Sequence, residues 1–217
     1  MSFLVVANFK SNKTLSQAKD WIDAVTPSPS LVVAPSFPHL SLFSKYASAG
    51  QDVSPFPPGS YTGAVNAQQL RDLGVTYCLI GHSERRQYFH ETNQDVANKA
   101  KELLDVKITP IICLREEDIL PQSVALDSDL LSRCFFCYEP PGDIGGTVAA
   151  PLTQITRVTA HIKQVYGVSQ VMYGGSVNAQ NISELLPLHL AGVIVSTACL
   201  NPESFNQIIQ QVVHAKI

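Results

Sequence analysis

Eight short apolar runs recur along the chain with helix-like segments between them, and this alternation restricts the fold more than any other feature. The runs are FLVVANF, LVVAP, YASAGQD, VTYCLIG, KITPIICL, CFFCYE, SQVMYGG and AGVIVST. Because nearly every position in them is apolar, they indicate strands of a parallel sheet that is covered by helices. A doubly wound sheet and a closed (β/α)8 barrel both satisfy this pattern.

The length of the chain favours the barrel. Eight units of about 27 residues lie near the lower size limit of a closed barrel, and a last helical segment after the eighth run suits closure. Spaced apolar residues predict helices at 15–25, 66–73, 93–104, 152–165, 182–186 and 201–213. Within 115–131 Pro121 interrupts any helix, so we expect an abbreviated helix there. We find no linker or internal repeat, so we predict one domain, 1–217.

Composition narrows the class of protein further. Hydrophobic residues make up 45% of the chain and charged residues 15%, which predicts a compact globule and argues against disorder. The formal charge of −3, without any Lys/Arg run, argues against nucleic acid and anionic membranes as partners. Because the chain shows neither a signal-peptide pattern nor a membrane-length apolar stretch, we expect a cytoplasmic protein.

Five cysteines, an odd number without repeated spacing, fit reduced thiols better than a disulfide framework. Cys134 and Cys137 form a C-x-x-C, which raises a redox or zinc site as an alternative. They lie on a predicted strand, where residues three apart face opposite sides of the sheet. We therefore expect both to be packing residues, and we expect neither a metal nor an organic cofactor.

Polar residues that directly follow the apolar runs are the candidates for chemistry, because parallel barrels gather reactive groups at the C-terminal ends of their strands. Asn8 and Lys10 come after the first predicted strand, His82 after the fourth and Glu139 after the sixth, where it closes the run CFFCYE. A helix that begins after His82 would disfavour a positive charge there, so a neutral imidazole could polarise a carbonyl. A shielded Glu139 could remove a proton beside that carbonyl. The plainer alternatives are a histidine that caps a turn and an ordinary strand-end acid.

Two glycine-rich segments complete the candidate site. Residues 140–150, PPGDIGGTVAA, predict a loop that closes over the site as a lid. The alternative is a surface loop without a functional role. The run YGGSV places Gly174 and Gly175 where backbone N–H groups can approach an anion. Gly-Gly also makes plain turns, but barrels commonly bind phosphate after their seventh and eighth strands.

The motifs ANFK, YTG, GHSERR, YEP, YGGSV and AGVIV, in this order, resemble the triosephosphate isomerase family along nearly the whole chain. GHSERR is the most specific of them. The resemblance implies a TIM barrel that interconverts dihydroxyacetone phosphate and glyceraldehyde 3-phosphate through an enediolate, without a cofactor. It also implies a homo-oligomer, either a homodimer or a homotetramer.

The resemblance also implies roles for single residues. Glu139 resembles the base and His82 the electrophile, a pairing of carboxylate and neutral histidine that is already established for that family. Lys10 resembles the cation that stabilises developing negative charge, and Asn8 the neighbour that helps to place the substrate. The phosphate-binding positions that it implies are Gly145, Gly174, Gly175, Ser176, Ser196 and Thr197.

Three further positions are implied outside the reacting centre. Glu84 resembles the acid beside the lysine, Tyr173 resembles a partner of the closed lid together with Ser176, and Thr62 resembles the loop tip that reaches across a subunit interface. Ala64 stands where the family usually has a glutamate after YTG, which predicts an altered subunit contact.

Two departures from the family pattern bear on activity. Ser196-Thr197 replace the Gly-Gly that the family usually shows after the last strand, and Gly142-Asp143 stand in place of a lid tryptophan. These two departures motivate an alternative function, a catalytically weak or inactive barrel that binds a phosphosugar or acts as an interaction protein. Arg115 also replaces the glycine that usually precedes Glu116, and with Ala64 it predicts an altered subunit contact.

Overall fold

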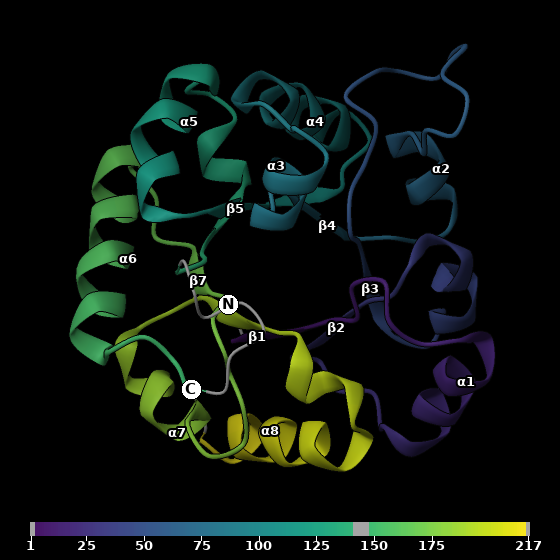
Figure 1. The fold of residues 1–217 in the computed structure, drawn as a ribbon, viewed down its shortest axis with the longest axis vertical. Coiled ribbons are helices and arrows are strands. Elements are labelled where there is room, and N and C mark those ends of the chain that lie inside the picture. The colour runs from purple at the N-terminus through teal and green to yellow at the C-terminus, as the bar shows by residue number, and fades with distance from the viewer. Residues whose placement is uncertain (1–2, 141–147, 216–217) are drawn as a thin grey trace.

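The computed structural model describes residues 3–140 and 148–215, whose strands close into a single parallel barrel (Figure 1). Each strand pairs with the next along the chain, and the last pairs with the first. The strands are β1 (Leu4–Asn8), β2 (Leu31–Ala34), β3 (Ala47–Gly50), β4 (Tyr77–Ile80), β5 (Thr109–Leu114), β6 (Phe135–Tyr138), β7 (Val171–Tyr173) and β8 (Gly192–Val195). Each lies within one predicted run, and the barrel prediction is confirmed over the doubly wound alternative.

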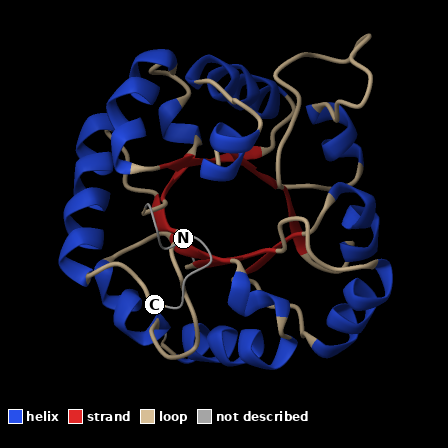
Figure 2. Ribbon diagram, viewed as in Figure 1, coloured by secondary structure: helices blue, strands red, loops and turns tan. Residues whose placement is uncertain are grey.

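Helices form a ring outside the strands (Figure 2). They are α1 (Leu15–Ala24), α2 (Ala67–Asp72), α3 (Ser83–Tyr88), α4 (Asn93–Asp105), α5 (Ile119–Ala125), α6 (Leu152–Tyr166), α7 (Ile182–Leu185) and α8 (Pro202–His214). Thr14, Asn66 and Thr92 begin α1, α2 and α4 with capping boxes, in which side chains satisfy backbone N–H groups that lack a helical partner. The predicted helices are confirmed to within two residues at each end.

Short 3₁₀ segments supply the rest of the outer layer. They are η1 (Phe37–Phe43), η2 (Glu116–Asp118), η3 (Leu131–Arg133), η4 (Leu186–Leu188) and η5 (Thr197–Leu200). In the described chain the connection from β2 to β3 is η1 alone, which helps to explain how a barrel fits into 217 residues.

The prediction that Pro121 interrupts the helix within 115–131 is wrong. Pro121 is the third residue of α5, and proline is tolerated in a first turn because the N–H groups there have no helical partner. The helix is nevertheless abbreviated, as expected, at seven residues.

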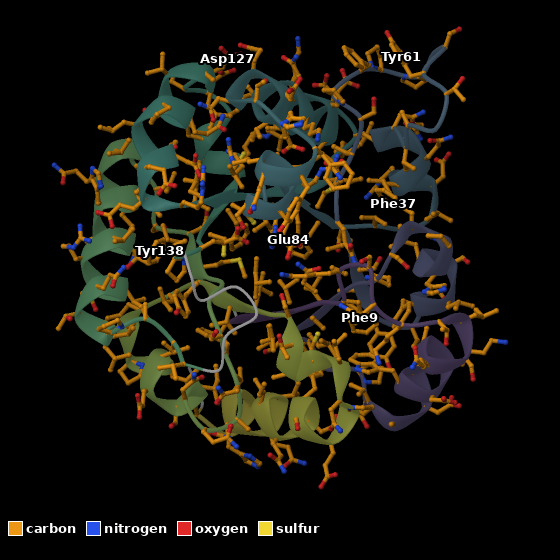
Figure 3. All side chains as sticks on the ribbon, in the orientation of Figure 1. Phe9, Phe37, Tyr61, Glu84, Asp127 and Tyr138 are labelled. Carbon is orange, nitrogen blue, oxygen red and sulfur yellow. The ribbon has the colours of Figure 1, made fainter. Side chains whose placement is uncertain are left out.

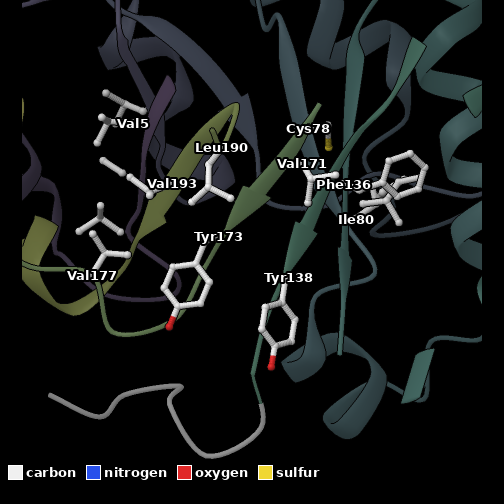
Figure 4. Close-up of a cluster of buried hydrophobic side chains, with 14 of the residues drawn as sticks. Val5, Cys78, Ile80, Phe136, Tyr138, Val171, Tyr173, Val177, Leu190 and Val193 are labelled. Carbon is white, nitrogen blue, oxygen red and sulfur yellow. The ribbon is translucent and has the colours of Figure 1, made fainter. Parts of the chain in front are cut away.

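The core has two layers that follow the alternation of side chains along the strands. The layer inside the barrel consists of Leu4, Val6, Val32, Ala34, Ala49, Leu79, Ile111, Cys113, Phe135, Cys137, Met172 and Ile194. The layer between strands and helices includes Phe136, Tyr138, Val171, Tyr173 and Val193 (Figure 4). It also holds an aromatic cluster in which the Phe9 ring lies 5.0 Å from Trp21 and 5.6 Å from Phe43.

The two cysteines of the C-x-x-C lie in different layers, as predicted. Cys134 belongs to the outer layer and Cys137 to the layer inside the barrel. Both are free and buried, and their opposite orientation makes them packing residues. In residues 3–140 and 148–215, the helices are too short or too polar to cross a membrane.

Candidate active site

The predicted base and electrophile meet at the C-terminal end of the barrel. Glu139 follows β6 and is 1% exposed, and His82 follows β4 and is also buried. One carboxylate oxygen of Glu139 lies 3.2 Å from Nε2 of His82, and the other accepts the backbone N–H of Ser83 at 3.1 Å. The carboxylate therefore rests on the N-terminus of α3, a position that favours negative charge.

The hydrogen bonds of His82 assign its protons. Its Nδ1 atom accepts the backbone N–H of Glu84 at 3.2 Å, so this nitrogen carries no hydrogen. The proton of a neutral imidazole then lies on Nε2, which can donate to Glu139 or to a ligand oxygen in its place. An imidazole in this tautomer can donate a hydrogen bond from Nε2, as the role predicted for His82 requires.

A cation lies next to this pair. The Nζ atom of Lys10 donates to Oε1 of Glu84 at 2.6 Å, and the Oδ1 atom of the buried Asn8 accepts the N–H of Lys10 at 3.0 Å. Lys10 has a φ of 50°, in the left-handed region that residues other than glycine rarely adopt. Backbone strain of this kind concentrates at functional sites. Gln51 helps to hold it, because Nε2 of Gln51 donates to the Lys10 carbonyl at 2.9 Å.

Beneath Glu139 the barrel interior is apolar and uncharged. Contact with Cys137, together with burial, raises the pKa of the Cys113 thiol well above its usual value, and burial raises the pKa of the Cys137 thiol. Both sulfurs therefore stay protonated at neutral pH. A Cβ atom on Gly174 would come within 2.9 Å of the Cys137 sulfur and 3.6 Å of Glu139 Cγ, so glycine is required beside the carboxylate.

The turn after β7 presents its backbone at the same end of the barrel. Ser176 has a φ of 47°, and its carbonyl accepts the side-chain amides of Asn181 at 2.9 Å and Asn178 at 3.3 Å. A Cβ atom on Gly175 would lie 2.6 Å from the Tyr173 hydroxyl and 2.7 Å from Pro140 Cγ. The two glycines thus allow a close packing that side chains would prevent.

The turn after β8 contains Ser196 and Thr197, and it lies beside the β7 turn because the two strands pair. Ser196 is partly buried and Thr197 is exposed. The end of η5, which follows this turn, is held through its carbonyl groups: Trp21 Nε1 donates to the Cys199 carbonyl at 2.8 Å, and Lys13 Nζ donates to the Leu200 carbonyl at 2.9 Å. The structure therefore places Ser196 and Thr197 near Gly174 and Gly175, as expected for a shared anion site.

The predicted lid, residues 140–150, directly follows Glu139 in the sequence. Residues 141–147, which include Gly142-Asp143 and Gly145, lie outside the described residues. After them, the Tyr173 hydroxyl accepts the Ala150 N–H at 3.0 Å, in keeping with the expected contact between Tyr173 and the lid segment. Tyr138 and Tyr173 lie on neighbouring strands with ring centroids 6.1 Å apart, and their hydroxyl groups point the same way (Figure 4).

Thr62 lies apart from the other candidates. It is exposed on the long connection between β3 and α2, which projects from the body of the barrel. The neighbouring Tyr61 lies at the periphery, whereas Glu84 is near the barrel mouth (Figure 3). The Tyr61 ring stacks on Phe56 at 4.7 Å, and both side chains are exposed.

Two functional groups were missed by the reading of the sequence. The Ser83 N–H that binds Glu139 could have been found from the predicted helix start after His82, whose first N–H groups lack helical partners. Gln51 lies at the end of the third apolar run and directly follows β3, so the strand-end rule that singled out His82 also applies to it. Within residues 3–140 and 148–215, we find no cluster of three or more His, Cys, Asp or Glu side chains that could hold a metal.

Comparison with known proteins agrees with this geometry. The family model for triosephosphate isomerase matches residues 3–212. A triosephosphate isomerase of Mesomycoplasma hyopneumoniae is 33% identical, with 96% of this chain and 99% of the relative covered. Those of Mycoplasmoides gallisepticum and Polynucleobacter asymbioticus are 32% and 34% identical, and cover 97% and 95% of this chain and 98% of each relative. The chain belongs to the triosephosphate isomerase family.

Proposed function

We propose that the chain is a catalytically active triosephosphate isomerase that interconverts dihydroxyacetone phosphate and glyceraldehyde 3-phosphate. The observation that carries this function is the contact between Glu139 and His82, in which a buried carboxylate lies 3.2 Å from Nε2 of a buried imidazole. A base and a hydrogen-bond donor at this spacing can act on a hydrogen and an oxygen of adjacent substrate carbons.

In the proposed reaction, the substrate enters between the two side chains and takes over their contact. Glu139 removes a proton from the carbon beside the carbonyl while His82 Nε2–H donates to the carbonyl oxygen, and an enediolate forms. The hydroxyl proton of the neighbouring carbon then moves to the former carbonyl oxygen. Glu139 returns the carbon-bound proton, or one exchanged from water, to that neighbouring carbon, and the isomer forms. Lys10 stabilises the negative charge that develops on oxygen, and Asn8 helps to place the substrate.

The proposed phosphate site lies at the ends of β7 and β8, between Glu139 after β6 and Lys10 after β1. Backbone N–H groups of the turn that contains Gly175 and Ser176, and of the turn that contains Ser196 and Thr197, supply the donors. The Gly174 N–H donates to the Tyr138 carbonyl at 2.9 Å, so Gly174 contributes to the site by its lack of a side chain. From the family resemblance we add Gly145 of the lid. The pairing of β7 with β8 supports a single anion that is shared by both turns.

We propose further that residues 1–217 form one domain and that this domain assembles as a homodimer or homotetramer in the cytoplasm. The projecting loop around Thr62, with exposed Phe56 and Tyr61, supports a contact with a second copy, because such aromatic side chains are enriched at protein interfaces. The family's reaction assigns the enzyme to glycolysis and gluconeogenesis.

Steady-state isomerisation of glyceraldehyde 3-phosphate tests the function, with wild type, Glu139→Gln and Glu203→Gln purified in parallel. Glu203 is an acid in the first turn of α8, at the outside of the barrel, so its variant is the matched control. We expect Glu139→Gln to lose at least about 10³-fold in kcat, within the range of general acid–base catalysis, and Glu203→Gln to retain wild-type activity. Folded wild type without turnover would refute the proposed function.

A further inference from the structure

We propose that Glu91 and Arg86 are positioning residues for the reaction, because they hold the backbone on both sides of Gly81, the residue directly before His82. This role rests on the proposed isomerase function, since it acts through the imidazole of His82. Neither side chain belongs to the predicted site, and each reaches the same glycine from a different direction.

Both peptide groups of Gly81 are bound by charged side chains. Oε1 of Glu91 accepts the Gly81 N–H at 2.8 Å, and Nε of Arg86 donates to the Gly81 carbonyl at 2.8 Å. Gly81 has a φ of +69°, and an added Cβ atom would lie 2.9 Å from Arg86 Nη2 and 3.2 Å from the Cys113 carbonyl. Glycine can adopt the widest range of backbone conformations. These contacts select one of them for Gly81 and thereby fix the position of the His82 backbone.

Glu91 is itself held by a buried set of charges. Its carboxylate accepts hydrogen bonds from Lys99 and, at 3.0 Å, from Arg85. Lys99 and Arg85 also bind Asp52, at 2.7 Å and 2.8 Å. The charges of the two carboxylates, Glu91 and Asp52, thus balance those of the two cations, Lys99 and Arg85. Charge-assisted hydrogen bonds of this kind, largely shielded from water, hold the Glu91 carboxylate in one orientation.

Arg86 is fixed in a comparable way. Its Nη1 atom donates to Oδ1 of Asn93 at 2.7 Å, and its Nη2 atom donates to Oε1 of Gln122 at 2.8 Å. Gln122 is fully buried and donates in turn to the Asn93 carbonyl at 3.0 Å. The planar guanidinium therefore has one orientation, and that orientation places Nε on Gly81.

The expected consequence is specific to the chemical step. A shift of Gly81 would move the His82 imidazole relative to Glu139 and to the substrate carbonyl, whereas the proposed phosphate turns follow β7 and β8. Loss of the Glu91 contact should therefore lower kcat and leave KM nearly unchanged. A displacement of about 1 Å at a reacting centre can cost about 10²-fold in rate.

Glu91→Gln and Asp52→Asn form a matched pair for the test. Each replaces an acid of the same charged set by its isosteric amide, but only Glu91 contacts Gly81. For both variants and wild type we would measure thermal unfolding, kcat and KM, and the ¹⁵N NMR signals of the His82 imidazole. We expect Glu91→Gln to lower kcat about 10–100-fold, to keep KM within about twofold and to shift the imidazole signals, while Asp52→Asn stays near wild type in kcat, KM and imidazole signals.

Three results would overturn the positioning role. They are a wild-type kcat in folded Glu91→Gln, an equal loss of kcat in both variants, and unchanged His82 signals in Glu91→Gln. If Glu91→Gln does not fold, Arg86→Lys replaces it, and a wild-type kcat there has the same meaning. If wild type itself shows no turnover, the proposed function fails, and the imidazole signals alone then decide whether Gly81 positions His82.

Discussion

The two sides of the barrel mouth are built in different ways. On the proton-transfer side, side chains bind one another: Lys10 pairs with Glu84 at 2.6 Å, and His82 meets Glu139 at 3.2 Å. On the anion side, the turns 174–176 and 196–197 present their backbone. Asn181 holds the Ser176 carbonyl, and Trp21 holds the Cys199 carbonyl just after the second turn. One side depends on the identity of its side chains, and the other on the path of its backbone.

This difference accounts for where the chain keeps the family motifs and where it departs from them. A backbone N–H group is present whatever side chain a residue carries, proline excepted, so Ser196 and Thr197 can replace glycines without removing a donor. Ser196 has a φ of −107°, which does not require glycine. A carboxylate base or a neutral imidazole has no such substitute, so we expect changes on the proton-transfer side to be far more damaging.

The largest effect after that of Glu139 should come from His82→Gln. An amide in place of the imidazole donates less well to the developing oxyanion, and loss of one such donor costs about 10²–10³ in kcat. Steady-state kinetics on the folded variant, with KM measured alongside, would check this. A kcat within tenfold of wild type would remove His82 from the role of electrophile.

Lys10→Met should have the next largest effect. It removes a cation whose charge-assisted hydrogen bonds contribute about 1.5–3 kcal/mol each, so we expect kcat/KM to fall about 10–100-fold. Glu84→Gln, which keeps the cation and removes its carboxylate partner, is the control and should lose less activity. Equal losses in the two variants would mean that the ion pair matters rather than the cation.

On the anion side, Gly175→Ala should displace the backbone of the turn after β7. The added methyl group would meet the Tyr173 hydroxyl and Pro140 at 2.6 Å and 2.7 Å, and such overpacking costs about 1–3 kcal/mol of folding free energy. We expect a lower melting temperature and about a tenfold loss in kcat/KM, below the roughly 10²-fold that about 1 Å of misplacement costs at a reacting centre. An unchanged KM and melting temperature would contradict the close packing of this turn.

The smallest effects are expected from Ser196→Ala and Thr197→Ala. If backbone N–H groups bind the phosphate, KM should change less than about threefold in either variant, because the lost hydroxyl is not the donor. A hydroxyl that did bind would contribute about 0.5–1.5 kcal/mol. A tenfold rise in KM for either variant would therefore show that a side-chain hydroxyl binds the phosphate. That result would contradict binding by backbone N–H groups alone.

Much of the barrel can be predicted from the sequence because its signals are local. All eight strands appear as apolar runs, and the rule that reactive groups follow strand ends is enough to identify His82 and Glu139. Pro121 was misjudged because its position within the helix, in the first turn, decides its effect. The 3₁₀ segment Phe37–Phe43 escaped prediction because its apolar residues lack a regular helical period.

Contacts between distant residues could not be predicted in this way. Asp52 and Lys99 are 47 positions apart, and Ser83 and Glu139 are 56 apart, so no periodicity or spacing links them. The family resemblance supplied roles for single residues, but the hydrogen bond of Glu139 to the start of α3 and the two contacts on Gly81 needed the structure. Long-range pairs of this kind orient the site.

The central claim is that Glu139 transfers a proton at the substrate carbon while His82 polarises the carbonyl. Its most direct test is isomerisation in D₂O, followed by ¹H NMR of the substrate and product carbons. We predict that wild type incorporates deuterium at the carbon that receives the proton and that Glu139→Gln shows neither exchange nor turnover. Deuterium exchange at the wild-type rate in Glu139→Gln, or turnover by that variant at the wild-type rate, would contradict the account.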